Sequence, residues 1–395
     1  MVQLVLEKLG GDVRTAVTSP AQAPAVTPEF ECYHIDARLS DNVQQVSVPS
    51  VKKVFRLLKY CFEAIWCRFR YGIPNLYFIP AHGARTSMVR DWLALAICRP
   101  FFKTLIYHWH AAGAGEWLET TARPWERRLA RAIMGRPNLS IVLLAHNRND
   151  ADAFGSRRVE VIANGIPDPC PRFDSELGPR RRRRTLARRK LLAGEKIGAG
   201  ERMEVGEDLE VFKVLFLSLC CREKGLFDAL EAVARANQQL GRAPVRVELS
   251  VAGTFPRREI LAEFETRLRE PDLNQSGPLV RYIGFVSGEE KTRLLASSDC
   301  LCFPTYYSAE SFGIVLLEAM AFGLPVITTR WRGLDELLPP SYAGVVDLRS
   351  PDQIATRLQK LMREEYDDSL RRKFEAGYTD EVLARNIRVA LLSLK

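Results

Sequence analysis

Apolar runs of strand type alternate with helical patterns along most of this 395-residue chain, which is typical of parallel sheets covered by helices on both faces. The predicted helices of the first half lie near residues 51–70, 86–98 and 116–134. The predicted strands are 75–79, 104–108 and 140–145 in the first half, and 212–217, 245–252, 280–283, 300–303 and 325–328 in the second. The pattern occurs twice, and the chain is long for one hydrophobic core. We therefore predict an α/β protein with two doubly wound domains.

Residues 169–210 interrupt this alternation with prolines, glycines and an arginine run at 180–184. Such a composition favours an exposed linker with an insertion, helical in part around 185–193, over a core element. The predicted domains are 1–168 and 211–378, joined by the linker 169–210 and followed by a C-terminal helix within 379–395.

The composition narrows the class of protein. Hydrophobic residues make up 47% of the chain, as in ordinary globular proteins, and no apolar stretch approaches the roughly 18 residues of a membrane-spanning helix. Nine cysteines without a metal-type CxxC pair favour reduced thiols in the cytoplasm over disulfides. The net charge of +9 suits an anionic partner, such as a nucleotide or a phospholipid surface. No nucleic-acid-binding motif accompanies the basic residues, which argues against nucleic acid.

Glu318 is the only charged residue between Glu310 and Arg330, and it lies in an apolar run. A carboxylate in so apolar a helix costs roughly several kcal/mol to desolvate unless it is paired or hydrogen-bonded, so we expect Glu318 to have a partner. Two helical glutamates at this spacing would diverge by about 80°. They converge better if Glu310 lies in the loop before the helix and Glu318 lies two turns inside it.

The start of the same predicted helix suits an anion. Ser311 is the expected N-cap, and the free amides of Phe312 and Gly313 have the positive end of the helix dipole behind them. A loop carboxylate, an anion-binding helix terminus and an inner carboxylate together fit a ligand that carries both phosphates and hydroxyls.

The run from Glu310 to Pro325 resembles the Glu-x7-Glu signature of family 4 glycosyltransferases, which are retaining enzymes with the GT-B fold. Further segments of the second half resemble this family in the same order. They are 211–232, 245–253, 282–286, 298–305, 325–328 and 333–336. In the first half, the resemblance rests on 108–110 and 161–166. Six ordered matches are far more specific than any one of them.

The resemblance implies two Rossmann-like domains that face a cleft, with the last helix crossing back onto the first domain. It implies a metal-independent hexosyltransferase that needs no cofactor and moves a sugar, with retention, from a nucleoside diphosphate sugar to a hydroxyl acceptor. The donor would bind mainly to the second domain and the acceptor to the first. The expected acceptor is a lipid-linked or cell-surface saccharide, as in polysaccharide biosynthesis at the inner face of a membrane.

The resemblance also assigns roles to individual residues. Glu318 would bind the ribose hydroxyls, and Glu310 would hold the transferred sugar and its phosphate. Lys224, at a predicted helix start, matches a diphosphate-binding lysine, whose charge would stabilise the leaving nucleoside diphosphate. The family usually has a second cation or a polar residue where this chain has Leu219, and we expect Arg222 to compensate.

Three further residues complete the predicted site. His110 matches a histidine of the family beside the transferred sugar. Asn164 lies in a turn that would line the cleft, and Phe285 lies in the matching segment 282–286. His108 points the same way as His110 on a predicted strand, so a metal pair is an alternative, although a core position is the commoner outcome for His108.

Asp150 and Asp152 form an Asp-Ala-Asp motif, which would bind a metal in the other large glycosyltransferase fold. They follow His146 at a predicted helix start, where acidic residues are favoured by the helix dipole. We therefore prefer a site without metal.

The first residues depart from the family. Residues 2–9 already resemble the helix after the family's opening strand and glycine-rich loop, and residues 13–18 resemble its next strand. Either translation starts upstream, or the first domain lacks its opening strand, which would put catalysis in doubt. A non-catalytic module that binds sugar nucleotide or membrane is therefore one alternative function. A sugar-nucleotide epimerase is another, although its motifs lack the Glu-x7-Glu run.

Residues 54–71 place large apolar side chains at helical spacing, with four Arg or Lys residues on other faces. We predict a Rossmann helix whose apolar face packs on its sheet. The alternative is an interfacial helix that makes peripheral contact with anionic lipid, assisted by the basic cluster 180–190. The apolar residues are Phe55, Leu58, Phe62, Ile65, Trp66 and Phe69.

Overall fold

The computed structural model describes residues 13–15, 32–35, 51–206, 208–274 and 277–394. The chain forms two compact units. The first comprises residues 1–165, 309–312 and 380–395, and the second comprises residues 166–308 and 313–379. Within the described ranges, no helix is long and apolar enough to cross a membrane.

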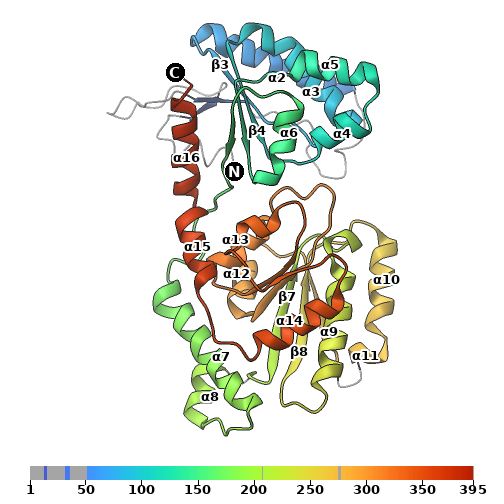
Figure 1. Ribbon diagram of the computed structural model, residues 1–395, viewed down its shortest axis with the longest axis vertical. Helices are drawn as coiled ribbons and strands as arrows, with labels where there is room; N and C mark the ends of the chain where they lie inside the picture. Colours follow the sequence, from blue (N-terminus) through green and yellow to red (C-terminus); the bar gives the residue numbers. More distant parts are fainter. Residues whose placement is uncertain (1–12, 16–31, 36–50, 207, 275–276, 395) are drawn as a thin grey trace. The chain divides into compact units, whose positions relative to one another are not determined.

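A six-stranded parallel sheet forms the centre of the second unit (Figure 1). Its strands are β7 (Val211–Leu217), β8 (Arg246–Ala252), β9 (Val280–Gly284), β10 (Cys300–Phe303), β11 (Val326–Thr329) and β12 (Val345–Val346). Their spatial order is β12-β11-β10-β7-β8-β9, so the sheet extends in both directions from the neighbours β7 and β10. The predicted strands of the second half are confirmed. In such doubly wound sheets, ligands bind where the strand order reverses.

Helices cover this sheet and bury its apolar strands. The core packs Leu230 and Val233 with Val214 and Val247, as expected for parallel strands buried on both faces. The helices are α9 (Leu226–Leu240), α10 (Arg258–Leu268), α11 (Pro271–Asn274), α12 (Gly288–Ser297), α13 (Ile314–Ala321), α14 (Pro351–Leu361) and α15 (Ser369–Gly377).

The first unit has a four-stranded parallel sheet in the order β3-β4-β5-β6. These strands are β3 (Asn75–Phe78), β4 (Thr104–Trp109), β5 (Leu139–Val142) and β6 (Val159–Val161). A separate parallel pair joins β1 (Val13–Thr15) to β2 (Cys32–His34). The helices are α2 (Val51–Arg70), α3 (Arg85–Cys98), α4 (Ala114–Thr120), α5 (Pro124–Met134), α6 (Arg148–Ala153) and α16 (Asp380–Leu392).

The last helix, α16, belongs to the first unit. Its side chains Leu383 and Ile387 pack with Ile106 and Ile141 of the first sheet. At the other end of the chain, the strand predicted over 13–18 is present as β1 in its described part. The helix predicted over 2–9 and the missing opening strand concern residues outside the described ranges.

The prediction that residues 169–210 form an exposed linker is wrong. The segment contains α7 (Gly178–Leu192) and α8 (Ala199–Val205), and it belongs to the second unit. Arg181, Arg184 and Arg188 of α7 are buried. Their spacing of three and four residues places them on one face of the helix, which is the face that contacts the unit's core.

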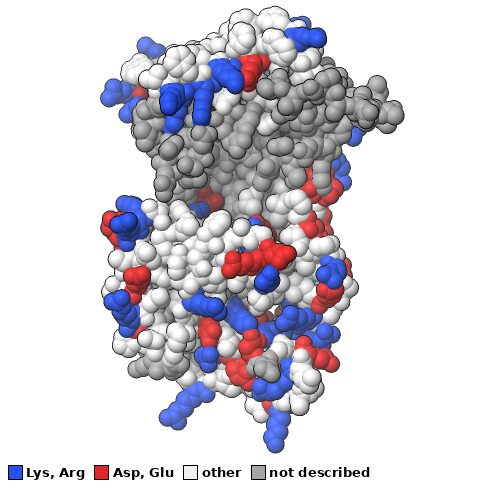
Figure 2. Space-filling model, turned by 180° about the vertical axis from the view of Figure 1, so that it is seen from behind, with Lys and Arg blue, Asp and Glu red and all other residues white. Residues whose placement is uncertain are grey.

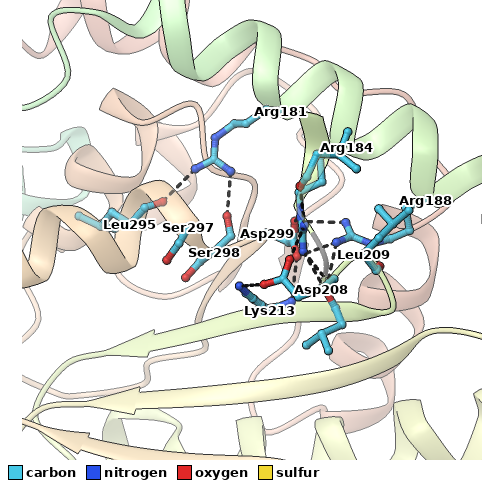
Figure 3. Close-up of polar contacts among 12 residues, drawn as sticks. Arg181, Arg184, Arg188, Asp208, Leu209, Lys213, Leu295, Ser297, Ser298 and Asp299 are labelled. Atoms are coloured by element: carbon cyan, nitrogen blue, oxygen red, sulfur yellow. Dashed lines mark hydrogen bonds and ion pairs between the residues drawn. The ribbon is translucent and has the colours of Figure 1, made fainter. Parts of the chain in front are cut away.

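Each buried arginine is held by fixed partners (Figure 3). Arg181 donates to the backbone oxygens of Leu295, Ser298 and Phe322 at 2.9, 2.8 and 2.9 Å. These carbonyls lie at the C-terminal ends of α12 and α13, where carbonyls lack helical partners and a cation is favoured. The arginine therefore caps two helices at once.

Arg184 and Arg188 share one carboxylate. Their guanidinium groups lie 3.0 and 2.8 Å from the oxygens of Asp299, and the amide of Lys213 donates to the same side chain at 2.9 Å. Burial alone would raise the pKa of Asp299, but the two arginines and the amide lower this pKa to about 2. The buried arginines of α7 are therefore bonded to acceptors of the second unit, because a planar guanidinium satisfies several buried acceptors at once.

The predicted packing face of α2 is also wrong. Phe55, Phe62 and Phe69 are 68%, 70% and 67% exposed. The helix instead buries Leu57, Cys61, Ala64 and Cys67.

Candidate functional site

The candidate site of the second unit lies where the strand order reverses, beyond the carboxyl ends of β7 and β10. The loop after β10 is bonded to the loop after β7, since the amide of Tyr306 donates to the carbonyl of Glu223 at 2.7 Å. Gly225 closes the first of these loops with φ +80, and a Cβ there would lie 2.3 Å from the carbonyl oxygen of Pro304. A glycine is therefore needed for the two loops to meet.

Lys224 lies between these loops, at the start of α9. Its Nζ is 5.4 Å from the ring centroid of Phe303 and 4.8 Å from that of Tyr307, distances at which a cation is attracted to an aromatic ring. The indole nitrogen of Trp331 donates to the carbonyl of Tyr307 at 2.8 Å and holds this loop in place. The sequence placed Lys224 at a helix start, but not beside these rings.

Arg222 points to a different neighbour. Its guanidinium forms an ion pair with Glu263 of α10 and lies 4.6 Å from the ring centroid of Phe227. Leu219, the position where the family usually has a cation, is 38% exposed in the same loop. The compensating role of Arg222 in nucleotide binding stays a prediction.

Glu318 has the partner that its apolar surroundings require. Lys291 of α12 lies 2.6 Å from the Oε1 atom of Glu318, and their side chains are 33% and 18% exposed. The sequence indicated that a partner was needed but did not identify Lys291. Lys291 directly follows Glu289 and Glu290 at the start of α12, and no local sequence pattern pairs it with Glu318.

The prediction that Ser311 is the N-cap of the following helix is wrong. The helix α13 begins at Ile314, and its N-cap is Gly313 in the left-handed conformation with φ +69. This backbone turn moves the helix start past Ser311. The Ser311 hydroxyl instead donates to the carbonyl of His110 at 2.7 Å, and both residues belong to the first unit. Glu310 and Phe312, in the same short segment, are buried.

The rings of the two histidines at the end of β4 lie against each other at a tilt of 40°, with centroids 4.0 Å apart. His108 is buried, and its Nδ1 lies 2.5 Å from the Tyr77 hydroxyl. Burial lowers the pKa of His108 well below its usual value and that of His110 to about 4. Within the described part of the chain, the Nε2 atoms of both rings are buried without a hydrogen-bond partner. Both histidines are therefore neutral near pH 7.

The other predicted residues belong to other elements of the fold. Asp150 accepts hydrogen bonds from the amides of Gly113 and Gly115 at 3.0 and 2.7 Å, and so organises the start of α4. Asn164 is buried after β6, while Phe285 is 72% exposed after β9. Among the described residues, no group of three or more His, Cys, Asp or Glu side chains is arranged to hold a metal ion.

Comparison with known proteins finds similar sequences for the second half of the chain. Residues 201–378 match the family model described as Glycosyl transferases group 1. A D-inositol 3-phosphate glycosyltransferase of Nocardioides sp. is 32% identical over 124 residues, which cover 31% of this chain and 26% of that protein. An alpha-1,3/1,6-mannosyltransferase of Homo sapiens is 31% identical over 159 residues, which cover 39% of this chain and 37% of that protein. These two matches thus span only 26% and 37% of the relatives' own lengths.

Solved structures match more of the chain at lower sequence identity. Sucrose-phosphate synthase from Thermosynechococcus elongatus has a TM-score of 0.62 and 18% identity, with 100% of this chain and 92% of that chain covered. Anabaena HepE, solved in complex with UDP and glucose, has a TM-score of 0.57 and 17% identity, with coverages of 88% and 84%. The resemblance in three dimensions concerns the fold. The chain therefore has the GT-B fold, and its residues 201–378 are similar to the glycosyl transferases group 1 family.

Proposed function

We propose that the protein is a glycosyltransferase that moves a sugar from a nucleoside diphosphate sugar to a hydroxyl acceptor. The observation that carries the proposal is Lys224, a cation held between two aromatic rings where the strand order of the second sheet reverses. A point charge there, at a helix start, suits a diphosphate. The fold neighbour HepE was solved with UDP, with UDP and glucose, and with UDP-glucose, which supports a sugar nucleotide as the donor.

The donor's ribose is the proposed ligand of Glu318. Its carboxylate would accept hydrogen bonds from the two hydroxyls, while Lys291, at 2.6 Å, orients the carboxylate. Lys291 thus acts through Glu318 as a positioning residue. Phe285 offers an exposed ring beyond β9, at the carboxyl edge of the same sheet, and the amides of Ser311, Phe312 and Gly313 remain candidates for the phosphates.

Transfer with retention, assisted by the leaving phosphate, is the mechanism we propose from the family resemblance. Glu310 would hold the transferred sugar, and His110 would contact it as a neutral imidazole. The lowered pKa of His110, about 4, fits a group that exchanges a single hydrogen bond with a hydroxyl and carries no charge near pH 7. Asn164 would line the same region.

The proposed acceptor is a lipid-linked or cell-surface saccharide, and the proposed location is the cytoplasm beside a membrane. The net charge of +9 supports an anionic surface near the protein. A non-catalytic sugar-nucleotide-binding module with this fold is the rival. Release of nucleoside diphosphate from the donor separates the two, since only an enzyme hydrolyses or transfers the sugar.

Calorimetric titration with UDP, GDP and ADP and with their glucose and mannose derivatives tests the donor site. Lys224→Ala should weaken the binding of the preferred nucleotide by about 1.5–3 kcal/mol, the scale of a hydrogen bond to a charged group. Lys360→Ala, which removes an exposed lysine from α14, is the matched control and should bind like the wild type. Equal affinity of the folded Lys224→Ala protein and the control would contradict the assignment.

An assay of donor turnover tests independence from metal. We expect donor turnover to survive excess EDTA, because Lys224 supplies positive charge where the diphosphate would bind. The donor site would instead be assigned to the Asp150-Ala-Asp152 motif if EDTA abolished turnover, manganese restored it and Asp152→Ala removed it.

A further inference from the structure

The helix α2 exposes most of its large apolar side chains, whereas its buried residues are one leucine, two cysteines and one alanine. Phe55, Phe62 and Phe69 are each about two-thirds exposed, at 68%, 70% and 67%, and Trp66 is 43% exposed. Large exposed apolar patches on soluble proteins mark sites of interaction.

The buried side of α2 is complete without these residues. Leu57, Cys61 and Ala64 pack with Ala94 and Cys98 of α3. The Sγ atom of Cys61 lies 3.9 Å from the carbonyl of Ala94. Because the small side chains let α2 and α3 approach closely, rotating the aromatic face inward would require a different packing of both helices. The packing of α2 against α3 therefore keeps the aromatic face directed away from α3.

The exposed apolar side chains form one straight stripe. At about 100° of rotation per residue, six of them fall within an arc of roughly 80° along some 27 Å of helix. Three basic residues, Lys52, Lys59 and Arg70, lie about 60–80° to one side of Phe62, along the edge of the stripe. The six apolar residues are Val51, Phe55, Leu58, Phe62, Trp66 and Phe69.

The charged residues of α2 are mostly basic. The helix carries six Lys or Arg residues and one acidic residue, Glu63, which lies 3.7 Å from Lys59. Figure 2, drawn from behind the view of Figure 1, shows Lys and Arg atoms, with smaller acidic areas next to them, beside uncharged surface in its upper part. An aromatic stripe edged by basic residues complements a surface that is apolar below and anionic above.

The aromatic surface continues past the end of α2. The rings of Phe69 and Phe101 meet edge to face at 6.0 Å, and the Nε atom of Arg68 donates to the carbonyl of Phe101 at 2.9 Å. Phe101 is itself 42% exposed. The fold thus fixes this second aromatic ring at the C-terminal end of the stripe.

We propose that α2 docks the protein on an anionic membrane surface, with its aromatic stripe at the boundary of headgroups and acyl chains. The basic residues along the stripe would lie at the lipid phosphates, as in helices that rest in the interface plane. This docking goes beyond the proposed sugar transfer and does not depend on it. A second copy of the chain fits the face less well, because a twofold contact would bring two rows of like charge together.

Cosedimentation with lipid vesicles tests the docking. The probes are vesicles of phosphatidylcholine with about 30% phosphatidylglycerol and vesicles of phosphatidylcholine alone. Phe55→Ser/Phe62→Ser should lower partitioning onto the anionic vesicles at least about tenfold. The matched control is Leu186→Ser/Met203→Ser, in α7 and α8. The side chains of Leu186 and Met203 are 50% and 86% exposed, and this variant should bind like the wild type. Circular dichroism confirms that each variant is folded.

The charge arm separates lipid phosphate from a purely apolar contact. Lys52→Gln/Lys59→Gln/Arg70→Gln should reduce binding to anionic vesicles about tenfold and leave binding to neutral vesicles unchanged, and added salt should weaken only the wild type appreciably. The proposal is overturned if the wild type binds neither vesicle, or if the two serine doubles bind alike. It is also overturned if light scattering shows a dimer that Phe55→Ser/Phe62→Ser dissociates while no vesicle binding occurs.

Discussion

The helices α2 and α7 contrast in where they place charge and apolar surface. In α2, aromatic side chains lie in solvent and thiols and alanine lie in the core, whereas α7 buries three arginines. The amphipathic pattern of α2 gives the direction of its apolar face but not the medium that this face meets. The arginines of α7 are buried because carbonyls and one carboxylate from other elements meet them. Burial is thus decided by the partners that the fold supplies, and not by residue type alone.

The strongest test of this contrast removes the shared carboxylate of α7. Asp299→Ala would leave Arg188, whose side chain is 3% exposed, as an uncompensated buried charge. We expect a loss of about 3–5 kcal/mol in the free energy of unfolding, measured by urea denaturation. Asp352→Ala, which breaks the exposed pair of Arg235 with a carboxylate 72% exposed, is the control and should cost about 1 kcal/mol or less. Similar losses for the two variants would refute the structural role of the arginine cluster.

Acid should weaken the same cluster. The pKa of Asp299 is lowered to about 2 in the folded protein, below its unfolded value of about 3.9. A lowered pKa contributes stability above the unfolded pKa, and this contribution is lost as the pH falls through the folded pKa. We expect about 2 kcal/mol of the free energy of unfolding to disappear between pH 5 and pH 2. Urea titrations at several pH values should show that the free energy of unfolding of Asp299→Asn lacks this part of the pH dependence. An equal pH dependence in the wild type and the variant would contradict the prediction.

The ion pair of Lys291 with Glu318 extends the comparison, because Glu318 also has a proposed ligand, the donor's ribose. Lys291→Met should weaken the binding of the preferred nucleoside diphosphate by about 1 kcal/mol, roughly fivefold in Kd, because Glu318 loses the group that orients it. Calorimetry with Lys360→Met as the control measures this. Tighter binding by Lys291→Met would show that the lysine competes with the ribose for Glu318.

The smallest effect is expected on the outer face of α2. Phe62→Ser should change the free energy of unfolding by about 0.5 kcal/mol or less, because the side chain is 70% exposed. Ala64→Leu, on the buried face two residues later, should cost about 1–3 kcal/mol through overpacking. Thermal and urea unfolding of both variants would check the assignment of faces. A larger cost for Phe62→Ser would mean that this face is covered within the protein.

Much of the fold follows from the sequence alone. The strands were predictable because parallel strands buried on both faces read as continuous apolar runs, as β7 and β10 do. The role of α7 was not predictable, because the acceptor that Arg181 meets at Phe322 lies 141 residues away along the chain. Only the tertiary structure brings such carbonyls to an arginine.

The candidate site was predictable in part. The need of Glu318 for a partner followed from its apolar surroundings, and Lys224 was placed by its position at a helix start. Lys291 could not be identified as this partner from the sequence, because it comes from a neighbouring helix. The N-cap was misplaced because the left-handed turn at Gly313 has no unique signature when a serine lies nearby.

The position of α16 has a consequence for synthesis on the ribosome. Ile106 and Ile141 of the first sheet are covered by Leu383 and Ile387, which are translated after all residues of the second unit. Domains usually complete their folding in the order in which they emerge. Here the N-terminal unit waits for its final helix while the whole second unit is made, and its uncovered isoleucines are exposed to chaperones during that interval.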